Sequence, residues 1–167
     1  MHVSFLFLRS APAEVVMGKL DTTDIRSLFS KWKVEHRDLN DQVDRFRDWA
    51  DAVAQSGVPK FGEAARQLSR LRERLLYHFA REKEMGHQLA EAYPEGSNEV
   101  AQSCKKAEQD HNQLMKELEG LIDRLSQLDP PFDSWEAAIS EVGLFAQRLD
   151  EHEAYECEHI EWLGPLM

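Results

Sequence analysis

Histidine and glutamate residues recur in this sequence at a spacing that suits metal binding. His78 is followed four residues later by Glu82, and His152 is followed four residues later by Glu156. On an α-helix, residues four apart lie on one face, one turn from each other. Each pair can therefore aim one imidazole and one carboxylate at a common centre. Imidazole and carboxylate ligands without thiolate suit iron, manganese or zinc.

Four helices are predicted to position these residues. Three clusters that combine Pro with Gly, Ser, Asn or Asp divide the chain into stretches rich in Ala, Leu, Glu, Gln, Lys and Arg. Such clusters end helices and form loops, and short loops make consecutive helices antiparallel neighbours. We expect the first helix to be capped within Asp21–Asp24 and the fourth by Asp133 or Ser134. The clusters are Ser56–Pro59, Pro94–Asn98 and Asp129–Asp133.

Apolar residues in each stretch recur at alternating spacings of three and four, which draws one stripe along each predicted helix. Polar residues interrupt every stripe near its middle. Five of the 7 histidines lie on the stripes, more than twice the share expected for a stripe of about two positions in seven. The stripes are expected over Phe29–Val53, Ala64–Leu89, Val100–Leu128 and Trp135–Leu163. The interruptions are His36, His78 with Glu82, His111, and His152 with Glu156.

These interruptions are predicted to lie in one layer. Residues at one level on antiparallel neighbours are equidistant from the loop that joins them. The midpoints between successive interruptions fall near residues 58, 95 and 132, all inside predicted loops. Each buried polar group without a partner costs on the order of 1–3 kcal/mol, so a bound metal is the expected compensation. Two carboxylates that can each bridge, set among four imidazoles, suit two metal ions.

The order and spacing of these residues resemble the hemerythrin-like, or HHE cation-binding, family over nearly the whole chain. The matching motifs are Glu-His36-Arg-Asp-Leu, His78-Phe-Ala-Arg-Glu82, Asp-His111-Asn-Gln-Leu and His152-Glu-Ala-Tyr-Glu156. The resemblance implies an all-α, antiparallel up-down-up-down four-helix bundle that holds two non-haem iron ions. It implies Glu82 and Glu156 as bridging carboxylates, and His36, His78, His111 and His152 as terminal ligands. The implied function is to bind or sense dioxygen, or iron itself.

One position departs from the family pattern. Hemerythrins proper carry two histidines one turn apart on the third helix, whereas Ala107 and Met115 flank His111 at that distance here. Glu108 or water is the candidate for the missing seventh ligand. The departure weighs against reversible oxygen carriage more than against the metal site itself.

Several alternatives remain open from the residues alone. The chain could be a di-iron oxidase or peroxidase, an iron-handling protein, or a metal-free helical interaction module. A ferritin-like site would use Glu-x-x-His motifs, which occur at Glu84–His87, Glu108–His111 and Glu156–His159. His87 points away from the second stripe and is expected at the surface. His159 lies about 10 Å beyond His152 along the helix axis and is expected near the bundle end.

The composition limits the classes of partner that the protein is expected to bind and the cellular compartment in which it is expected to lie. The 167 residues contain 20 Lys and Arg against 31 Asp and Glu, a net charge of −11. With no basic cluster, this balance argues against nucleic acids and anionic membrane surfaces. Two cysteines suit a reducing, cytoplasmic setting. We expect an N-terminal arm over residues 1–20 and one bundle over 21–167, as a monomer or a homodimer through the apolar part of the arm.

Overall fold

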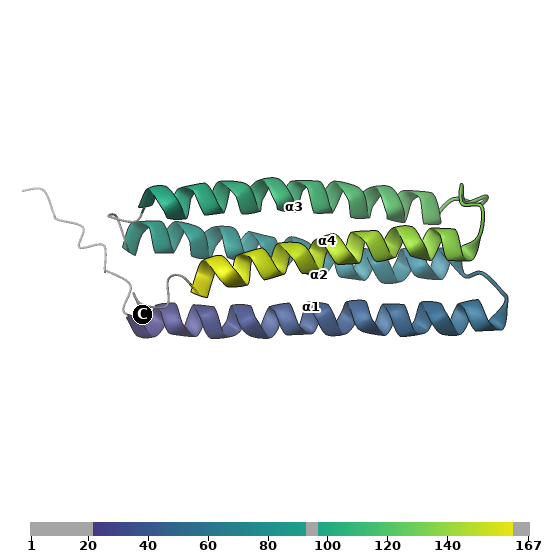
Figure 1. Cartoon of the computed structure of the whole chain (residues 1–167), viewed down its shortest axis with the longest axis horizontal. Coiled ribbons are helices and arrows are strands. Elements are labelled where there is room, and N and C mark those ends of the chain that lie inside the picture. The colour runs from purple at the N-terminus through teal and green to yellow at the C-terminus, as the bar shows by residue number, and fades with distance from the viewer. Residues whose placement is uncertain (1–21, 93–96, 162–167) are drawn as a thin grey trace, which may run out of the picture.

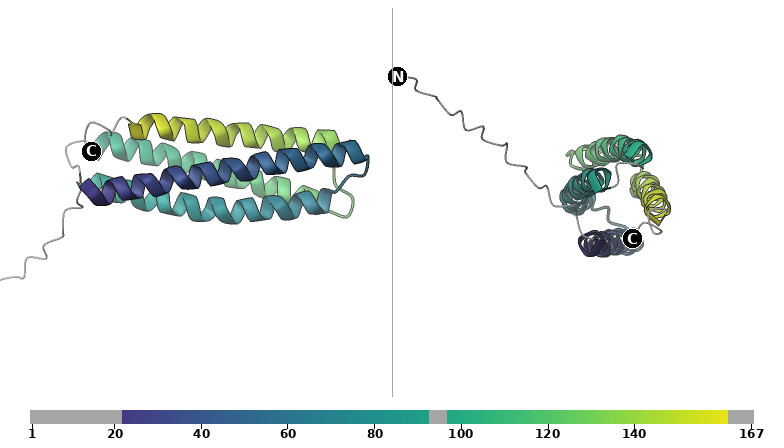
Figure 2. Two further views of the ribbon diagram at one scale, coloured as in Figure 1. Left: turned by 90° about the horizontal axis from the view of Figure 1, so that it is seen from below. Right: turned by 90° about the vertical axis from the view of Figure 1, so that its left-hand side faces the viewer.

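The chain folds as four long antiparallel helices, as the resemblance and the spacing predicted. The computed structural model describes residues 22–92 and 97–161. Consecutive helices run up and down alternately along one long axis (Figure 1), and the end-on view shows the four packed around a common centre (Figure 2). The helices are α1 (Thr22–Ser56), α2 (Phe61–Ala92), α3 (Ser97–Leu125) and α4 (Trp135–Glu161). The predicted arm over residues 1–20 lies outside the described residues.

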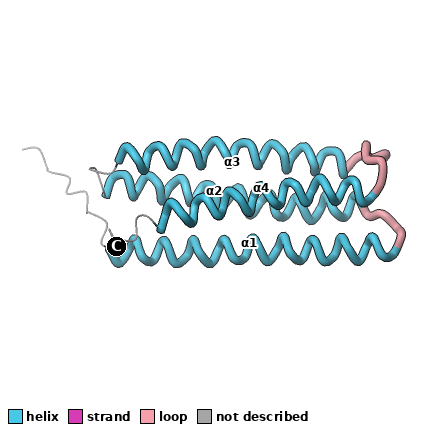
Figure 3. The backbone as a smooth tube through the Cα atoms, in the orientation of Figure 1, coloured by secondary structure: helices cyan, strands magenta, loops and turns pink. Residues whose placement is uncertain are grey.

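Two of the connecting loops, α1–α2 and α3–α4, lie at the same end of the bundle (Figure 3). Gly57 ends α1 with a φ of 68°, a left-handed conformation that glycine adopts without strain, and its amide donates to the Ala54 carbonyl at 3.1 Å. Ser134 caps α4, because its hydroxyl accepts a hydrogen bond from the Ala137 amide at 3.1 Å. Of the two predicted caps, Asp133 and Ser134, the structure therefore shows Ser134 as the cap of α4.

The third helix is shorter than its apolar stripe. α3 ends at Leu125, and Leu128, which continues the stripe in sequence, is fully exposed. The Gln127 amide bonds the Arg124 carbonyl, three residues back, which tightens the chain into a turn ahead of Pro130. The prediction that the stripe extends to Leu128 was wrong because a residue can keep the helical period in sequence after the helix has ended.

A layer of four leucines fills the core just on the loop side of the predicted metal ligands. Each leucine lies three residues from one of the four predicted ligand histidines, toward the α1–α2 and α3–α4 loops. All four are buried. Such a layer excludes water from one side of the histidine layer. The leucines are Leu39, Leu75, Leu114 and Leu149.

Within residues 22–92 and 97–161, no helix combines the length and the apolar character that a membrane span requires.

Candidate metal centre

All six predicted ligands meet in the middle of the bundle. Their exposed fractions lie between 3% and 9%, and every one of the four helices contributes. The helical pitch explains the meeting, since each residue occupies a stripe position that faces the bundle axis. The residues are His36 on α1, His78 and Glu82 on α2, His111 on α3, and His152 and Glu156 on α4.

The six residues form two overlapping groups. Within each group, one ligand atom from every residue lies within 4.8 Å of the others. The first group contains His36 and His78, the second contains His111 and His152, and both groups share Glu82 and Glu156. Two cation positions that share two carboxylates are the arrangement of a binuclear metal site.

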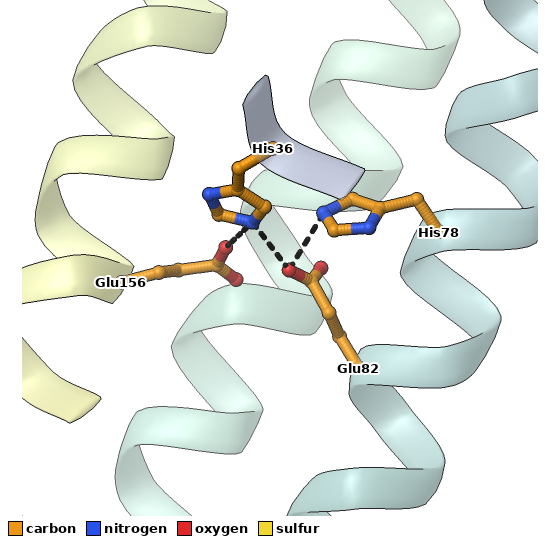
Figure 4. Close-up of side chains that lie close together, drawn as sticks. All are labelled: His36, His78, Glu82 and Glu156. Atoms are coloured by element: carbon orange, nitrogen blue, oxygen red, sulfur yellow. Dashed lines mark hydrogen bonds and ion pairs between the residues drawn. The ribbon is translucent and has the colours of Figure 1, made fainter. Parts of the chain in front are cut away.

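The first group is shown in Figure 4. The Oε1 atom of Glu82 lies 2.8 Å from His78 Nε2 and 3.1 Å from His36 Nε2. The Oε2 atom of Glu156 reaches toward the same group and lies 3.7 Å from His36 Nε2. One oxygen of each carboxylate therefore faces the first group.

The other oxygen of each carboxylate faces the second group. Glu82 Oε2 lies 3.1 Å from His111 Nε2. Glu156 Oε1 lies 3.3 Å from His111 Nε2 and 3.1 Å from His152 Nε2. Each carboxylate thus divides its two oxygens between the two groups, as a bridging ligand does.

Several of these nitrogen and oxygen atoms lie close together but do not form hydrogen bonds with one another. His78 Nε2, His152 Nε2, Glu82 Oε2 and Glu156 Oε2 are buried and have no partner in hydrogen-bonding geometry. Buried polar atoms are normally paired, and each orphaned group costs on the order of 1–3 kcal/mol. A cation between these nitrogen and oxygen atoms is the partner that they lack, so the residues fit a metal.

The electrostatics of the cluster favour charged groups. Burial opposes the ionisation of Glu82, but its close contacts with His111, His36 and His78 outweigh burial and hold the pKa of this carboxyl well below its usual range. Burial also opposes the charge on His111, yet its contacts with Glu156 and Glu82 raise its pKa to about 9. The pKa of His78 is raised in the same way, against burial, chiefly by Glu82.

The metal-free chain is expected to lose stability as the pH rises toward 9. The pKa of His111 is about 9 in the folded chain against an ordinary value of 6.5. Its charged form therefore stabilises the fold fully below pH 6.5, and this contribution is lost as the pH rises through 9. Urea unfolding of the chelator-treated protein at several pH values measures the effect. A free energy of unfolding that stays constant over this window, or falls as steeply in His111→Ala, would contradict the prediction.

Trp32 is a contact to the centre that the sequence did not reveal. The residue is an aromatic of the first stripe and is 3% exposed. In addition, its indole Nε1 donates a hydrogen bond of 2.6 Å to Glu82 Oε1. Its position one turn before His36 on the same stripe is the signal that could have suggested this contact.

Four other residues that the sequence analysis considered are not placed at the centre. Glu108, proposed as a seventh ligand, is exposed and accepts a hydrogen bond of 2.7 Å from Lys83 Nζ. Its side chain therefore points away from the bundle axis, toward Lys83 of α2. Glu84 and His87 are both exposed, which excludes the ferritin-like alternative at that motif. The side chain of His159 lies outside the described part of the chain.

An apolar cavity of about 260 Å³ lies between α1, α2 and α4. Its lining includes Val43, Leu71 and Phe145, which are each seven residues from a ligand histidine, about 10 Å along the helix axis. The leucine layer lies between the cavity and the six ligands. None of the six lines the cavity.

Comparison with known proteins agrees with this geometry. A family model described as the hemerythrin HHE cation binding domain matches residues 27–160. No curated protein and no solved structure matches the chain.

Proposed function

The chain belongs to the hemerythrin HHE cation-binding family, and from that premise we propose that it is a non-haem di-iron protein that binds or senses dioxygen, or iron itself, in the bundle core. The observation that carries this proposal is the division of the carboxylate oxygens. Glu82 and Glu156 each direct one oxygen to the first group and one to the second. Two carboxylates held in this way would bridge a pair of metal ions.

The donor set supports iron as the metal. Each group offers two imidazoles and two carboxylates and no thiolate, a set that suits iron, manganese or zinc. The family resemblance favours iron among these. Each group also supplies four residues, fewer than the six donors of an octahedral ion, which leaves room for a small ligand. When bound, a pair of ferrous ions would supply the open position and the electrons that dioxygen binding needs.

The surrounding residues exclude water from one side of the centre and hold the Glu82 carboxylate in place. Leu75 and Leu149 are fully buried beside the histidine layer. Exclusion of water strengthens the electrostatic interactions inside and limits loss of electrons to solvent. The Trp32 indole fixes Glu82 from the side opposite to the leucines through its 2.6 Å hydrogen bond.

Oxygen uptake by the iron-loaded protein tests this function. The chain is loaded with Fe(II) under nitrogen, and its visible spectrum and oxygen consumption are recorded when air-saturated buffer is added with a reductant present. A binding or sensing protein is expected to change its spectrum and to consume oxygen in proportion to its iron, and then to stop. The variant Glu108→Gln, which alters an exposed carboxylate on α3, serves as the matched control and should behave as the unchanged chain does.

Sustained consumption of oxygen over many turnovers would instead identify a di-iron oxidase. An iron-loaded sample whose spectrum is insensitive to oxygen would contradict dioxygen as the ligand and leave iron itself.

A further inference from the structure

Each of the four predicted ligand histidines contacts a side chain of a neighbouring helix on the side of its ring away from the cluster. The contacting residue is always adjacent in sequence to another of these histidines. Glu35 precedes His36, Phe79 follows His78, Asp110 precedes His111, and Glu153 follows His152. These residues lie beside the stripes, so they point sideways toward the next helix. The pairs run around the bundle: Glu35 with His78, Phe79 with His111, Asp110 with His152, and Glu153 with His36.

Of these four contacts, the one between Glu35 and His78 is a direct hydrogen bond. Its Nδ1 forms a hydrogen bond of 3.2 Å with Glu35 Oε2. The other oxygen of Glu35 accepts a short hydrogen bond from Arg81, one turn further along α2. Glu35 is therefore held between two side chains of α2, and its carboxylate fixes the orientation of the imidazole.

Two more carboxylates lie near the Nδ1 atoms of other ligands. Asp110 Oδ2 is 3.7 Å from His152 Nδ1, and Glu153 Oε2 is 4.0 Å from His36 Nδ1. Both distances exceed a direct hydrogen bond, and His152 Nδ1 has no hydrogen-bond partner, so a small side-chain rotation would be needed to complete either bond. Glu153 is 5% exposed, and one of its oxygens has no hydrogen-bond partner, so it is a buried carboxylate whose nearest imidazole is a ligand.

His111 is supported differently. Its ring stacks on the Phe79 ring with centroids 3.8 Å apart and an interplanar angle of 10°. Among the residues that the structure describes, no carboxylate lies within 4.0 Å of its Nδ1; its ion pairs are made through Nε2. A phenyl ring restrains the plane of the imidazole but accepts no strong hydrogen bond from Nδ1.

We propose that Glu35, Asp110 and Glu153, here called the backing carboxylates, orient three of the four histidine ligands, and that the second group therefore binds its metal more weakly than the first. This inference rests on the proposed binuclear site. A carboxylate at Nδ1 holds the proton there, leaves Nε2 free for the metal and makes the imidazole a stronger donor. Both histidines of the first group have a carboxylate within 4.0 Å of Nδ1, whereas in the second group only His152 does.

Stepwise titration with cobalt(II), a spectroscopic probe for such sites, tests the proposal. The metal-free chain is titrated under nitrogen in competition with a chelator, and bound metal is followed by visible absorption. Loss of an outer carboxylate typically weakens metal binding by roughly 10–100-fold. We expect Glu35→Gln to weaken the first, tighter step by this factor and Asp110→Asn to weaken the second step alone. Asp38→Asn, an exposed acidic residue of α1, is the matched control and should change neither step.

The melting temperature of each metal-free variant separates orientation of ligands from a role in folding, because orientation leaves that temperature unchanged. The Asp110 side chain is 40% exposed, so Asp110→Asn is expected to fold. This variant tests the proposal even if Glu35→Gln unfolds. Two bound cobalt ions with both steps unaffected by Asp110→Asn, or a weakened first step in that variant, would overturn the inference while the binuclear site stands. Fewer than two ions bound to the unchanged chain would contradict the binuclear site itself.

Discussion

Replacing Glu82 by alanine is expected to remove both metal ions from the chain. Glu82 directs Oε1 to His36 and His78 and Oε2 to His111, so its loss takes one donor from each group at once. Elemental mass spectrometry on the purified Glu82→Ala protein measures the effect, with fewer than about half an ion per chain as the expected result.

The controls for this prediction come from the same structure. Glu108→Ala removes an equal charge from the exposed face of α3 and should leave two ions bound. His111→Ala removes a ligand of the second group only, so it should keep the ion of the first group. A Glu82→Ala protein that is folded and still holds two ions would show that Glu82 does not bridge.

Removal of the metal is expected to lower the melting temperature by about 10 °C. A ligand at about 1,000 times its dissociation constant stabilises the folded state by roughly 4 kcal/mol, and each kcal/mol shifts the melting temperature of a chain of this size by about 2–4 °C. The physical origin is the burial of six polar side chains, several of which have no partner without a cation. Calorimetry of the metal-loaded and chelator-treated protein measures the difference.

A metal-free interaction module predicts the opposite pattern. In that case the chelator leaves the melting temperature unchanged, and His78→Ala is neutral or stabilising because a buried polar group is removed. In a metal centre, His78→Ala lowers the melting temperature of the metal-loaded protein toward that of the chelator-treated chain. Equal melting temperatures with and without metal would therefore contradict the proposed function.

The fold was predictable because local signals agreed with one another. The three clusters of Pro, Gly, Ser, Asn and Asp mark the helix ends to within a few residues, and the stripes of period 3.6 identify the buried faces. The error at Leu128 arose where these signals conflicted, since the apolar period continued into residues that the following prolines keep out of the helix.

The meeting of the six predicted ligands could be foreseen for a different reason. Antiparallel helices joined by short loops convert sequence distance from a loop into height along the bundle, so the level of His36 could be compared with that of His111 without coordinates. The stripe then determined that both face inward. Their exposed fractions of 6% and 9% are the outcome of those two constraints.

The backing carboxylates could not be predicted in this way. Glu35, Asp110 and Glu153 lie beside the stripes, where acidic residues are common on solvated helix faces. Their contact with an imidazole of the next helix depends on the rotation and separation of two packed helices, which the sequence does not encode locally. Glu153 is buried at 5% exposure while Glu108 is exposed, although both lie close in sequence to a ligand histidine.

The metal content of the chain, expressed with iron supplied and measured by elemental mass spectrometry, tests the central claim most directly. Two groups that share Glu82 and Glu156 predict about two irons per chain in a folded sample. About one zinc per chain, or no metal in a folded sample, would contradict the di-iron centre and indicate a mononuclear or purely structural bundle.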